Sequence, residues 1–177
     1  MLLYVLLGVA AFVALFVLVA ALQPAAFHIE RSAVIQAPPE KPFSHVNDFR
    51  AWEAWSPWEG KDPAMKRDYT GAASGVGAKY AWFGNKDVGE GRMTIESADA
   101  PRRLGIKLEF IKPFAATNQA TFTFAPEGGG TKVTWGMDGN RNLMMKAFGL
   151  FVNMDKLVGP DFERGLANLR GLSEKEG

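Results

Sequence analysis

The chain has 177 residues, of which 47% are hydrophobic and 22% charged, and its 20 Lys and Arg against 19 Asp and Glu leave a net charge of +1. A nucleic-acid-binding domain needs a concentrated basic face, and this balance gives no indication of one, so we expect no nucleic-acid partner. The absence of cysteine excludes disulfides, thiolate chemistry and cysteine ligands for metals.

The chain begins with an apolar run, and no charged side chain occurs in the first 27 residues. A helix of ~22 residues is about 33 Å long, which is enough to cross a bilayer. We therefore predict a transmembrane anchor over residues 1–23. A cleaved signal peptide is the main alternative, although such peptides have a basic start and a shorter apolar stretch. A buried core helix is a further alternative, which the lack of a polar stripe disfavours.

The rest of the chain is predicted to be one globular domain over residues 27–172, followed by a loose tail over 173–177. The flanks of the apolar run bear on its orientation in a membrane. Arg31 and Lys41 lie within the ~20 residues that follow the run, and no Lys or Arg precedes it. The positive-inside rule therefore favours a single-pass membrane protein with its domain on the cytoplasmic side.

The domain is predicted to open with a strand and two short helical segments. Residues 27–37 alternate in hydrophobicity, which indicates a strand. Residues 39–47 predict a short helix, because their leading proline is tolerated in a first helical turn. Residues 50–56 add a further helical turn, which Pro57 ends.

Further strands and a terminal helix complete the predicted order. In the fourth of these strands, Leu104 and Ile106 point one way and Lys107 the other, and such alternation indicates an antiparallel sheet with one face on the core. The period then changes to three and four residues over 142–176, which predicts a long amphipathic helix, bent or interrupted at Pro160. The six strands are 64–71, 77–84, 90–98, 103–111, 117–127 and 131–139.

This order predicts an α+β fold in which a curved antiparallel sheet grips a long C-terminal helix. The apolar face of the sheet and the apolar stripe of the helix must cover each other. A strongly bent sheet cannot close tightly along a whole helix, so we expect a cavity between the two.

Several stretches of the sequence resemble the START/helix-grip superfamily, specifically the SRPBCC group named polyketide cyclase/dehydrase and lipid transport. The resemblance covers roughly residues 28–172 and implies a hydrophobic pocket for a lipid-like or aromatic small molecule. Because members share a cavity and differ in its use, the resemblance leaves enzymes, carriers and protein-binding modules open. The stretches are "IERSAVIQAPPEKPFSHVNDFRAWEAWSPW", "GVGAKYAWFG", "GEGRMTI", "GTKVTW" and "DKLVGPDFERGLANLRGL".

Three of the five tryptophans, Trp52, Trp55 and Trp58, lie within the ten residues "AWEAWSPWEG". Trp52 and Trp55 share a face of the predicted helical turn. Core packing at a corner of the domain is their favoured role, since wide rings bury a large area. The alternatives are the wall of a ligand pocket and contact with the membrane interface, where Trp is enriched.

Inward-facing strand and helix positions are the candidates for lining a pocket, although plain core is the simpler interpretation of apolar stripes. Asn118 differs from the others because it falls in phase with Ala120 and Phe122. An amide that faces an apolar cavity needs a hydrogen-bond partner, which a ligand could supply unless the residue lies beyond the core edge in water. The candidates are Trp55, Met93, Phe110, Asn118, Phe122, Trp135 and Met137, with Phe148 and Phe151 from the helix.

Catalytic constellations are scarce in the sequence. His45 and Asp48 are three residues apart and could orient an imidazole for base catalysis, although a solvated surface pair is the simpler interpretation. No metal-binding spacing, serine-nucleophile turn or phosphate-binding loop occurs. We therefore predict no catalytic residue, no metal and no cofactor.

The preferred hypothesis is a membrane-anchored domain that binds a hydrophobic or lipid-like small molecule between its sheet and C-terminal helix. The first alternative is an enzyme of the cyclase/aromatase kind, which needs an inward polar group such as Asn118, Arg92 or Asp138. The second is a protein-interaction module, for which a filled core and an exposed apolar patch on the outer sheet face are expected. The sequence names no protein partner.

Overall fold

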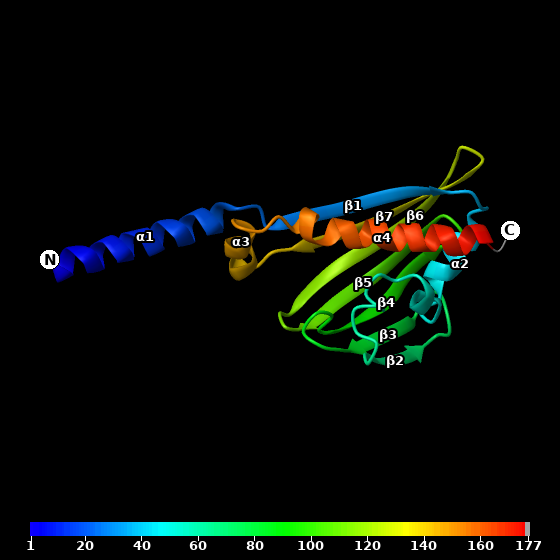
Figure 1. Ribbon diagram of the computed structural model, residues 1–177, viewed down its shortest axis with the longest axis horizontal. Helices are drawn as coiled ribbons and strands as arrows, with labels where there is room; N and C mark the ends of the chain where they lie inside the picture. The colour runs from blue at the N-terminus through cyan, green and yellow to red at the C-terminus, as the bar shows by residue number, and fades with distance from the viewer. Residues whose placement is uncertain (176–177) are drawn as a thin grey trace.

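The computed structural model describes residues 1–175, and Figure 1 shows the elements along the chain. Every predicted strand and short helix forms, with ends within two residues of those expected. The elements are α1 (Leu2–Leu22), β1 (Ala26–Ile35), α2 (Glu40–Asn47), the 3₁₀ turn η1 (Ala51–Ala54), β2 (Lys66–Gly71), β3 (Ala78–Phe83), β4 (Glu90–Asp99), β5 (Arg103–Lys112), β6 (Ala116–Glu127), β7 (Gly130–Asn140), α3 (Leu143–Gly149) and α4 (Met154–Lys175).

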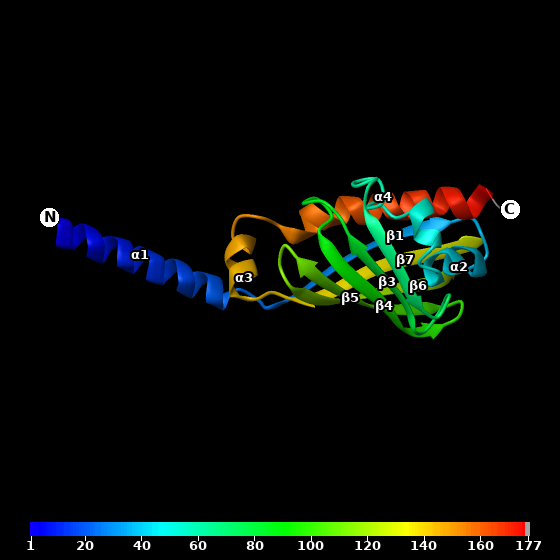
Figure 2. The ribbon, with the colours of Figure 1, turned by 90° about the horizontal axis from the view of Figure 1, so that it is seen from below.

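The seven strands form a single antiparallel sheet in the order β1-β7-β6-β5-β4-β3-β2. The sheet is strongly curved, and α4 lies along β1 and β7, as Figures 1 and 2 show from two sides. This arrangement confirms the predicted helix-grip fold. Because β1 begins beside α1 and successive strands alternate in direction, the starts of β4 and β6 and the ends of β3, β5 and β7 share one end, here called the α1 end.

The strand register aligns inward-facing side chains in rows that cross the sheet. Ile95 and Ile106, in the middle of the sheet, are fully buried, as the period-2 alternation predicts. One row toward the α1 end contains Phe27, Gly139, Asn118, Leu108, Met93 and Tyr80. The row nearer the opposite end contains Arg31, Trp135, Phe122 and Leu104.

The short helix α2 closes the end of the sheet opposite α1. It begins directly after Pro39, as expected for a proline tolerated at a helix start. Its apolar face buries Phe43 and Val46 against the sheet. The Phe43 ring meets the edge of the Phe124 ring on β6, with centroids 5.4 Å apart.

The C-terminal helix is interrupted between α3 and α4 rather than at Pro160, so the predicted position of the break is wrong. Two asparagine caps explain the difference, because Asn142 accepts a hydrogen bond from the backbone N–H of Met145 and Asn153 accepts one from that of Asp155, each at 2.9 Å. Pro160 lies within α4 on its exposed side, where water can satisfy the carbonyl left without an N–H donor.

The end of the chain also differs from the prediction of a loose tail. Helix α4 continues to Lys175, so residues 173–175 are helical, and Ser173 is fully buried. Residues 176 and 177 lie outside the described part of the chain. Glu174 also joins α4 to the sheet, since its carboxylate accepts a hydrogen bond from the Gln36 backbone N–H at 2.8 Å.

An ion pair fastens α4 to β1 at the sheet edge. The Arg31 guanidinium donates to Asp155 at 2.8 Å and to Glu163 at 2.7 Å, and these contacts hold the pKa of Asp155 below its usual range. Gly159 lies between the two carboxylates on α4, and a Cβ at this position would collide with the guanidinium. The glycine therefore permits the close approach of helix and strand.

Helix α1 projects away from the domain, as Figure 1 shows. It has 21 residues, carries no charge, and buries only Ala20. The alternative of a core helix is therefore wrong, since a core helix is buried on most of its surface. By length and composition α1 can cross a bilayer, and a signal sequence passes the same test.

Candidate functional site

The tryptophans of residues 51–60 lie over the sheet at the centre of an aromatic cluster. Trp135 on β7 is 3% exposed and stacks on Phe162 of α4, with ring centroids 4.2 Å apart and planes 6° from parallel. On its other side it stacks on Phe122 at 4.9 Å. Trp55 and Trp58 each meet the Trp135 ring edge-on at 5.6 Å.

The indole N–H groups of Trp52 and Trp55 donate to backbone carbonyls and are not left for a ligand. Trp52 donates to the carbonyl of Val46 at 2.9 Å, and Trp55 donates to that of His45 at 3.2 Å. The favoured interpretation of this stretch as corner packing is therefore confirmed for Trp52 and Trp55, which are both buried.

The space between the sheet and the middle of α4 is consequently filled, where we expected a cavity. Trp55, Phe122 and Trp135, three predicted pocket residues, belong to the filled core. Gly165 of α4 illustrates the tight fit, because a Cβ at this position would lie 2.8 Å from the Trp135 ring. The sheet curves as expected, but side chains from the segment before β2 occupy its concavity.

Ion pairs and a hydrogen bond hold residues 56–65 of that segment against α4, against β2 and against the turn after β3. Lys61 pairs with Asp161 of α4 at 2.6 Å, and Glu59 pairs with Arg67 of β2 at 2.5 Å. Asp62 accepts a hydrogen bond from the backbone N–H of Asn85 at 2.7 Å. These contacts fix the segment as a cover over the concave face.

Glu59 also accepts a hydrogen bond from the Tyr80 hydroxyl at 3.0 Å inside the sheet. Burial, together with the neighbouring Glu59 carboxylate, raises the pKa of Tyr80 well above its usual range. The phenol therefore stays protonated and serves as a hydrogen-bond donor, not as a base.

The part of the concave face nearest α1 is different, because methionines form part of its lining and it is less completely covered. Met93 and Met137 are buried there, while Leu108 and Phe110 are half-buried. Asn118 lies among them, 7% exposed, and its register partners are Leu108 on one side and Gly139 on the other. The sequence therefore placed Met93, Phe110, Asn118 and Met137 correctly on the inner face.

The amide of Asn118 is incompletely satisfied. Its Nδ2 contacts the sulfur of Met137 at 3.6 Å, and its Oδ1 is buried without a hydrogen-bond partner among the described residues. Gly139 makes room for this amide, since a Cβ there would collide with Oδ1 and with the Phe27 ring. An unpaired buried carbonyl oxygen costs roughly 1–3 kcal/mol.

Two other predicted pocket residues, Phe148 and Phe151, do not face the interior. Phe148 is 54% exposed and Phe151 is 79% exposed, and both lie in or just after α3, outside the sheet. Phe151 instead stacks on Phe16 of α1 at 6.2 Å. The prediction failed because it extended the apolar stripe of α4 through the interruption at residues 150–153.

The polar groups proposed for an enzyme mostly face solvent. Arg92 pairs with Glu109 at 2.8 Å on the outer sheet face, and this contact lowers the pKa of Glu109 to about 2. Asp138 accepts a hydrogen bond from His28 at 2.7 Å on the same face, which raises the pKa of His28. Asn118 is thus the inward-facing member of the three groups suggested for catalysis.

The remaining candidate pair is His45 and Asp48. The carboxylate of Asp48 caps the following turn by accepting a hydrogen bond from the backbone N–H of Arg50 at 2.8 Å. Within residues 1–175, no group of three or more His, Cys, Asp or Glu side chains is placed to hold a metal ion.

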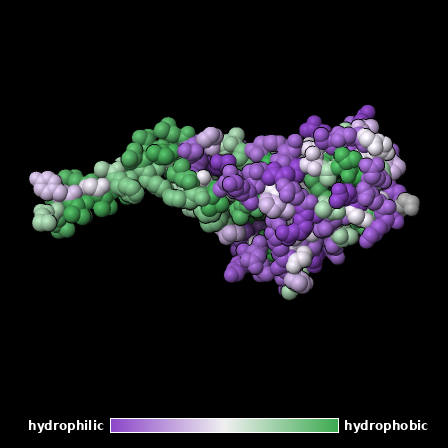
Figure 3. All heavy atoms as spheres, turned by 45° about the horizontal axis from the view of Figure 1, so that its top comes forward, coloured by the Kyte–Doolittle hydropathy of each residue, from purple (hydrophilic) through white to green (hydrophobic). Residues whose placement is uncertain are grey.

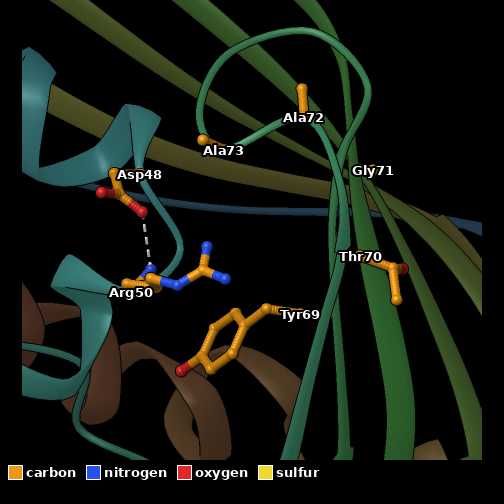
Figure 4. A pocket seen from close by; sticks show the side chains of 7 residues that line it. All are labelled: Asp48, Arg50, Tyr69, Thr70, Gly71, Ala72 and Ala73. Atoms are coloured by element: carbon orange, nitrogen blue, oxygen red, sulfur yellow. Dashed lines mark hydrogen bonds between the residues drawn. The ribbon is translucent and has the colours of Figure 1, made fainter.

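A hollow of about 320 Å³ opens at the end opposite α1, between the α2–η1 turn and the β2–β3 loop. Figure 4 shows the Arg50 guanidinium extended over the Tyr69 ring inside it, 4.8 Å from the ring centroid. The backbone of Ala72 and Ala73 forms the rim. The hollow lies outside the grip between sheet and α4.

A second hollow, of about 430 Å³, lies toward the α1 end of the sheet. Its lining includes Lys107, Gln119 and Asp138, which occupy the outward-facing phase of their strands. Because side chains of successive strand residues point to opposite faces, these three side chains lie on the outer face. Phe27, Asn118 and Gly139 of the inner row also border the hollow.

Comparison with known proteins agrees with this architecture. The family described as polyketide cyclase / dehydrase and lipid transport matches residues 26–174. A search of curated proteins finds no match.

Solved structures show the same fold at low sequence identity. A Chromobacterium violaceum protein is 16% identical over 83% of this chain and 96% of its own, with a TM-score of 0.61. A Mesorhizobium loti protein is 18% identical over 85% of this chain and 99% of its own, with a TM-score of 0.62. The Aha1 dimer from Colwellia psychrerythraea is 14% identical over 84% of this chain and 96% of its own, with a TM-score of 0.59.

Proposed function

The chain belongs to the polyketide cyclase/dehydrase and lipid transport family, and we propose that it binds a hydrophobic or lipid-like small molecule while α1 tethers it to a membrane. We place the binding site on the concave face near α1, around Asn118, rather than in the middle of the grip. The middle is occupied by the rings around Trp135.

The observation that carries this proposal is the unpaired Oδ1 of Asn118. Buried polar groups in proteins are nearly always hydrogen-bonded, so an exception calls for a partner. A hydroxyl or a protonated carboxyl group of a ligand can donate to this oxygen, while its apolar part lies on the neighbouring side chains. Such sites are typically apolar with few polar groups that orient the ligand.

The side chains around Asn118 can make room for a ligand. Met93 and Met137 are unbranched, and methionine adapts its shape to irregular surfaces. Leu108 and Phe110 retain some exposure, so the face is not sealed at this position. We infer that entry takes place here, between the sheet and the start of α4, without displacement of the aromatic cluster.

A tether suits such a ligand, because it raises the local concentration of the binding site at the bilayer. The length and apolar composition of α1 support membrane insertion. Arg31 and Lys41 are the first cationic residues after α1, and they favour the cytoplasmic side for the domain.

A leucine substitution of Asn118 tests the proposal. The full chain is purified from membranes, and the small molecules that it retains are measured by native mass spectrometry. For Asn118→Leu we expect about fivefold lower occupancy, since one hydrogen bond contributes about 1 kcal/mol. The stability of the unliganded protein should not fall, because the substitution removes an unpaired polar group.

Gln119→Leu is the matched control, since the neighbouring amide points to the outer face. We expect it to leave the occupancy unchanged. Equal occupancy in both variants, or a loss of stability in Asn118→Leu alone, would show that the Asn118 amide is a structural group.

A protein-interaction module is the second candidate, and the filled aromatic centre around Trp135 favours it. Wild-type protein that retains no small molecule from cells would support this alternative over ligand binding. A cyclase-type enzyme has less support, because Arg92 and Asp138 face outward and the amide of Asn118 is not an ionisable group.

A further inference from the structure

The α1 end of the domain carries almost all of its exposed large apolar side chains. Among the described residues after α1, Val76 in the β2–β3 loop and Leu157 in α4 are the exceptions. Figure 3 shows apolar surface that continues from α1 onto the adjoining part of the domain, while most of the remaining face is hydrophilic. The residues on and beside α3 and at the β5–β6 turn are Leu143, Met144, Phe148, Phe151, Ile111 and Phe114.

Helix α3 packs directly on the last turns of α1. The Phe151 ring stacks on the Phe16 ring with centroids 6.2 Å apart. Lys146 donates a hydrogen bond to the backbone carbonyl of Ala21 at 3.1 Å. This carbonyl belongs to the last turn of α1, where carbonyls have no partner within the helix. Together the two contacts fix the height of α3 along α1.

That height corresponds to the inside of a bilayer when α1 crosses it. The 21 residues of α1 end at Leu22. Their length of about 32 Å nearly equals the roughly 30 Å of a hydrocarbon core, so Leu22 lies close to the hydrocarbon boundary. Phe16 is six residues earlier and about 9 Å deeper. Phe151, which stacks on Phe16, then lies among lipid chains.

We propose that residues 143–151 are embedded in the membrane interface beside α1 and seat the α1 end of the domain on the lipid. The inference rests on the proposed insertion of α1. Interfacial helices bury their apolar face about 5–10 Å into the boundary between headgroups and acyl chains. Lys146 fits this arrangement, since a lysine stem can lie along apolar surface while its ammonium group reaches a polar partner, here the carbonyl of Ala21 at the end of α1.

This placement deepens the proposed function, because it brings the part of the concave face around Asn118 toward the bilayer. Phe27 and Gly139, in the same row as Asn118, lie at the junction from which α1 and α3 depart. A lipid-like molecule can then pass from the bilayer to the concave face without crossing water.

The absence of native cysteine allows labelling at single sites in the full chain. Met144→Cys and Phe148→Cys carry an environment-sensitive nitrobenzoxadiazole label in phosphatidylcholine vesicles with or without brominated acyl chains. Phe12→Cys reports the insertion of α1, and Val76→Cys is the matched exposed control at the opposite end. We expect blue-shifted emission and bromine quenching at 144 and 148 comparable with those at 12, and neither at 76.

The outcomes separate this inference from the membrane tether. Quenching at 12 without quenching at 144 and 148 overturns the inference and leaves the insertion of α1 intact. No quenching at 12 overturns the tether, and the inference with it. Blue-shifted but unquenched labels at 144 and 148 mean that a second copy of the chain covers this surface, which also overturns the inference.

Discussion

Asn118 and Gln119 are adjacent amides that the strand places in opposite surroundings. Asn118 is buried beside Met137 with its carbonyl oxygen unpaired, whereas Gln119 points to the outer face, where it borders the second hollow. Both leucine variants lose a side-chain amide, so a difference in ligand occupancy between them reflects the position of the amide and not its chemistry. Only the inner amide is placed to meet a ligand on the concave face, and its unpaired oxygen is the strongest single indication of function in this chain.

Trp135 is the centre of the filled core, and its loss should be costly. Trp135→Ala removes the stacking on Phe122 and Phe162, and substitutions of this kind cost about 3–5 kcal/mol. We expect a decrease of that size in the free energy of unfolding of the full chain in detergent, measured by urea denaturation. A much smaller decrease, accompanied by altered ligand retention, would assign the ring to a binding pocket instead.

The sequence predicted which side chains face inward, but it could not predict whether they leave a cavity. Alternation along β6 and β7 places Asn118, Phe122 and Trp135 correctly, because neighbouring strand residues must point to opposite faces. Whether the enclosed space is empty depends on Trp55 and Trp58, which come from an irregular segment. Periodicity does not determine the direction of side chains there.

Attachment of α4 to β1 depends on the absence of a side chain at one position. Gly159→Ala places a Cβ against the Arg31 guanidinium and displaces it from Asp155 and Glu163. We expect destabilisation of about 1–3 kcal/mol in chemical denaturation, as is typical of overpacking.

Gly171→Ala is the control for this substitution. Gly171 also lies in α4, but nothing lies within 4 Å of the position of its Cβ. Alanine is the better helix former, so this variant should gain up to about 1 kcal/mol. Destabilisation of equal size in both variants would contradict a specific role for the gap at Gly159.

The pairing of β4 with β5 should depend on pH through Glu109. Arg92 and Lys107 lower the pKa of Glu109 to about 2 in the folded state, below its usual value of 4.5. The stabilisation is therefore complete above about pH 4.5 and is lost as the pH falls toward 2. In acid denaturation, Glu109→Gln should flatten the fall in stability between these values, and an unchanged profile would rule out this contribution.

The sequence contains signals for the interruption between α3 and α4, but the spacing of apolar residues does not reveal it. Apolar residues continue at intervals of three and four across residues 150–153, so a continuous helix was expected. Asn142 and Asn153 cap the starts of the two helices, and asparagine is a helix-start signal. A prediction from periodicity alone does not take this signal into account. Consequently Phe148 and Phe151 were assigned to the grip, although they belong to the surface beside α1.

The hydrophobic character of the molecule changes along its long axis. An apolar helix occupies one end, and an exposed apolar surface on α3 adjoins it (Figures 1 and 3). The inner face near Asn118 follows. Beyond it lie the solid aromatic cluster and the hydrophilic far end. The fold followed from the order of elements, and the family from that order together with the stretches that resemble it. The gradient, in contrast, required three-dimensional placement, because its parts come from both ends of the chain.

Photo-crosslinking tests most directly whether a ligand binds near Asn118. The full chain in vesicles is loaded with a fatty acid that carries a diazirine at its chain end, irradiated, digested and sequenced by mass spectrometry. Besides α1, which bilayer lipid reaches, we predict crosslinks on Met93, Leu108 and Met137. Crosslinks confined to α1 and α3, or located on the outer sheet face, would contradict the account.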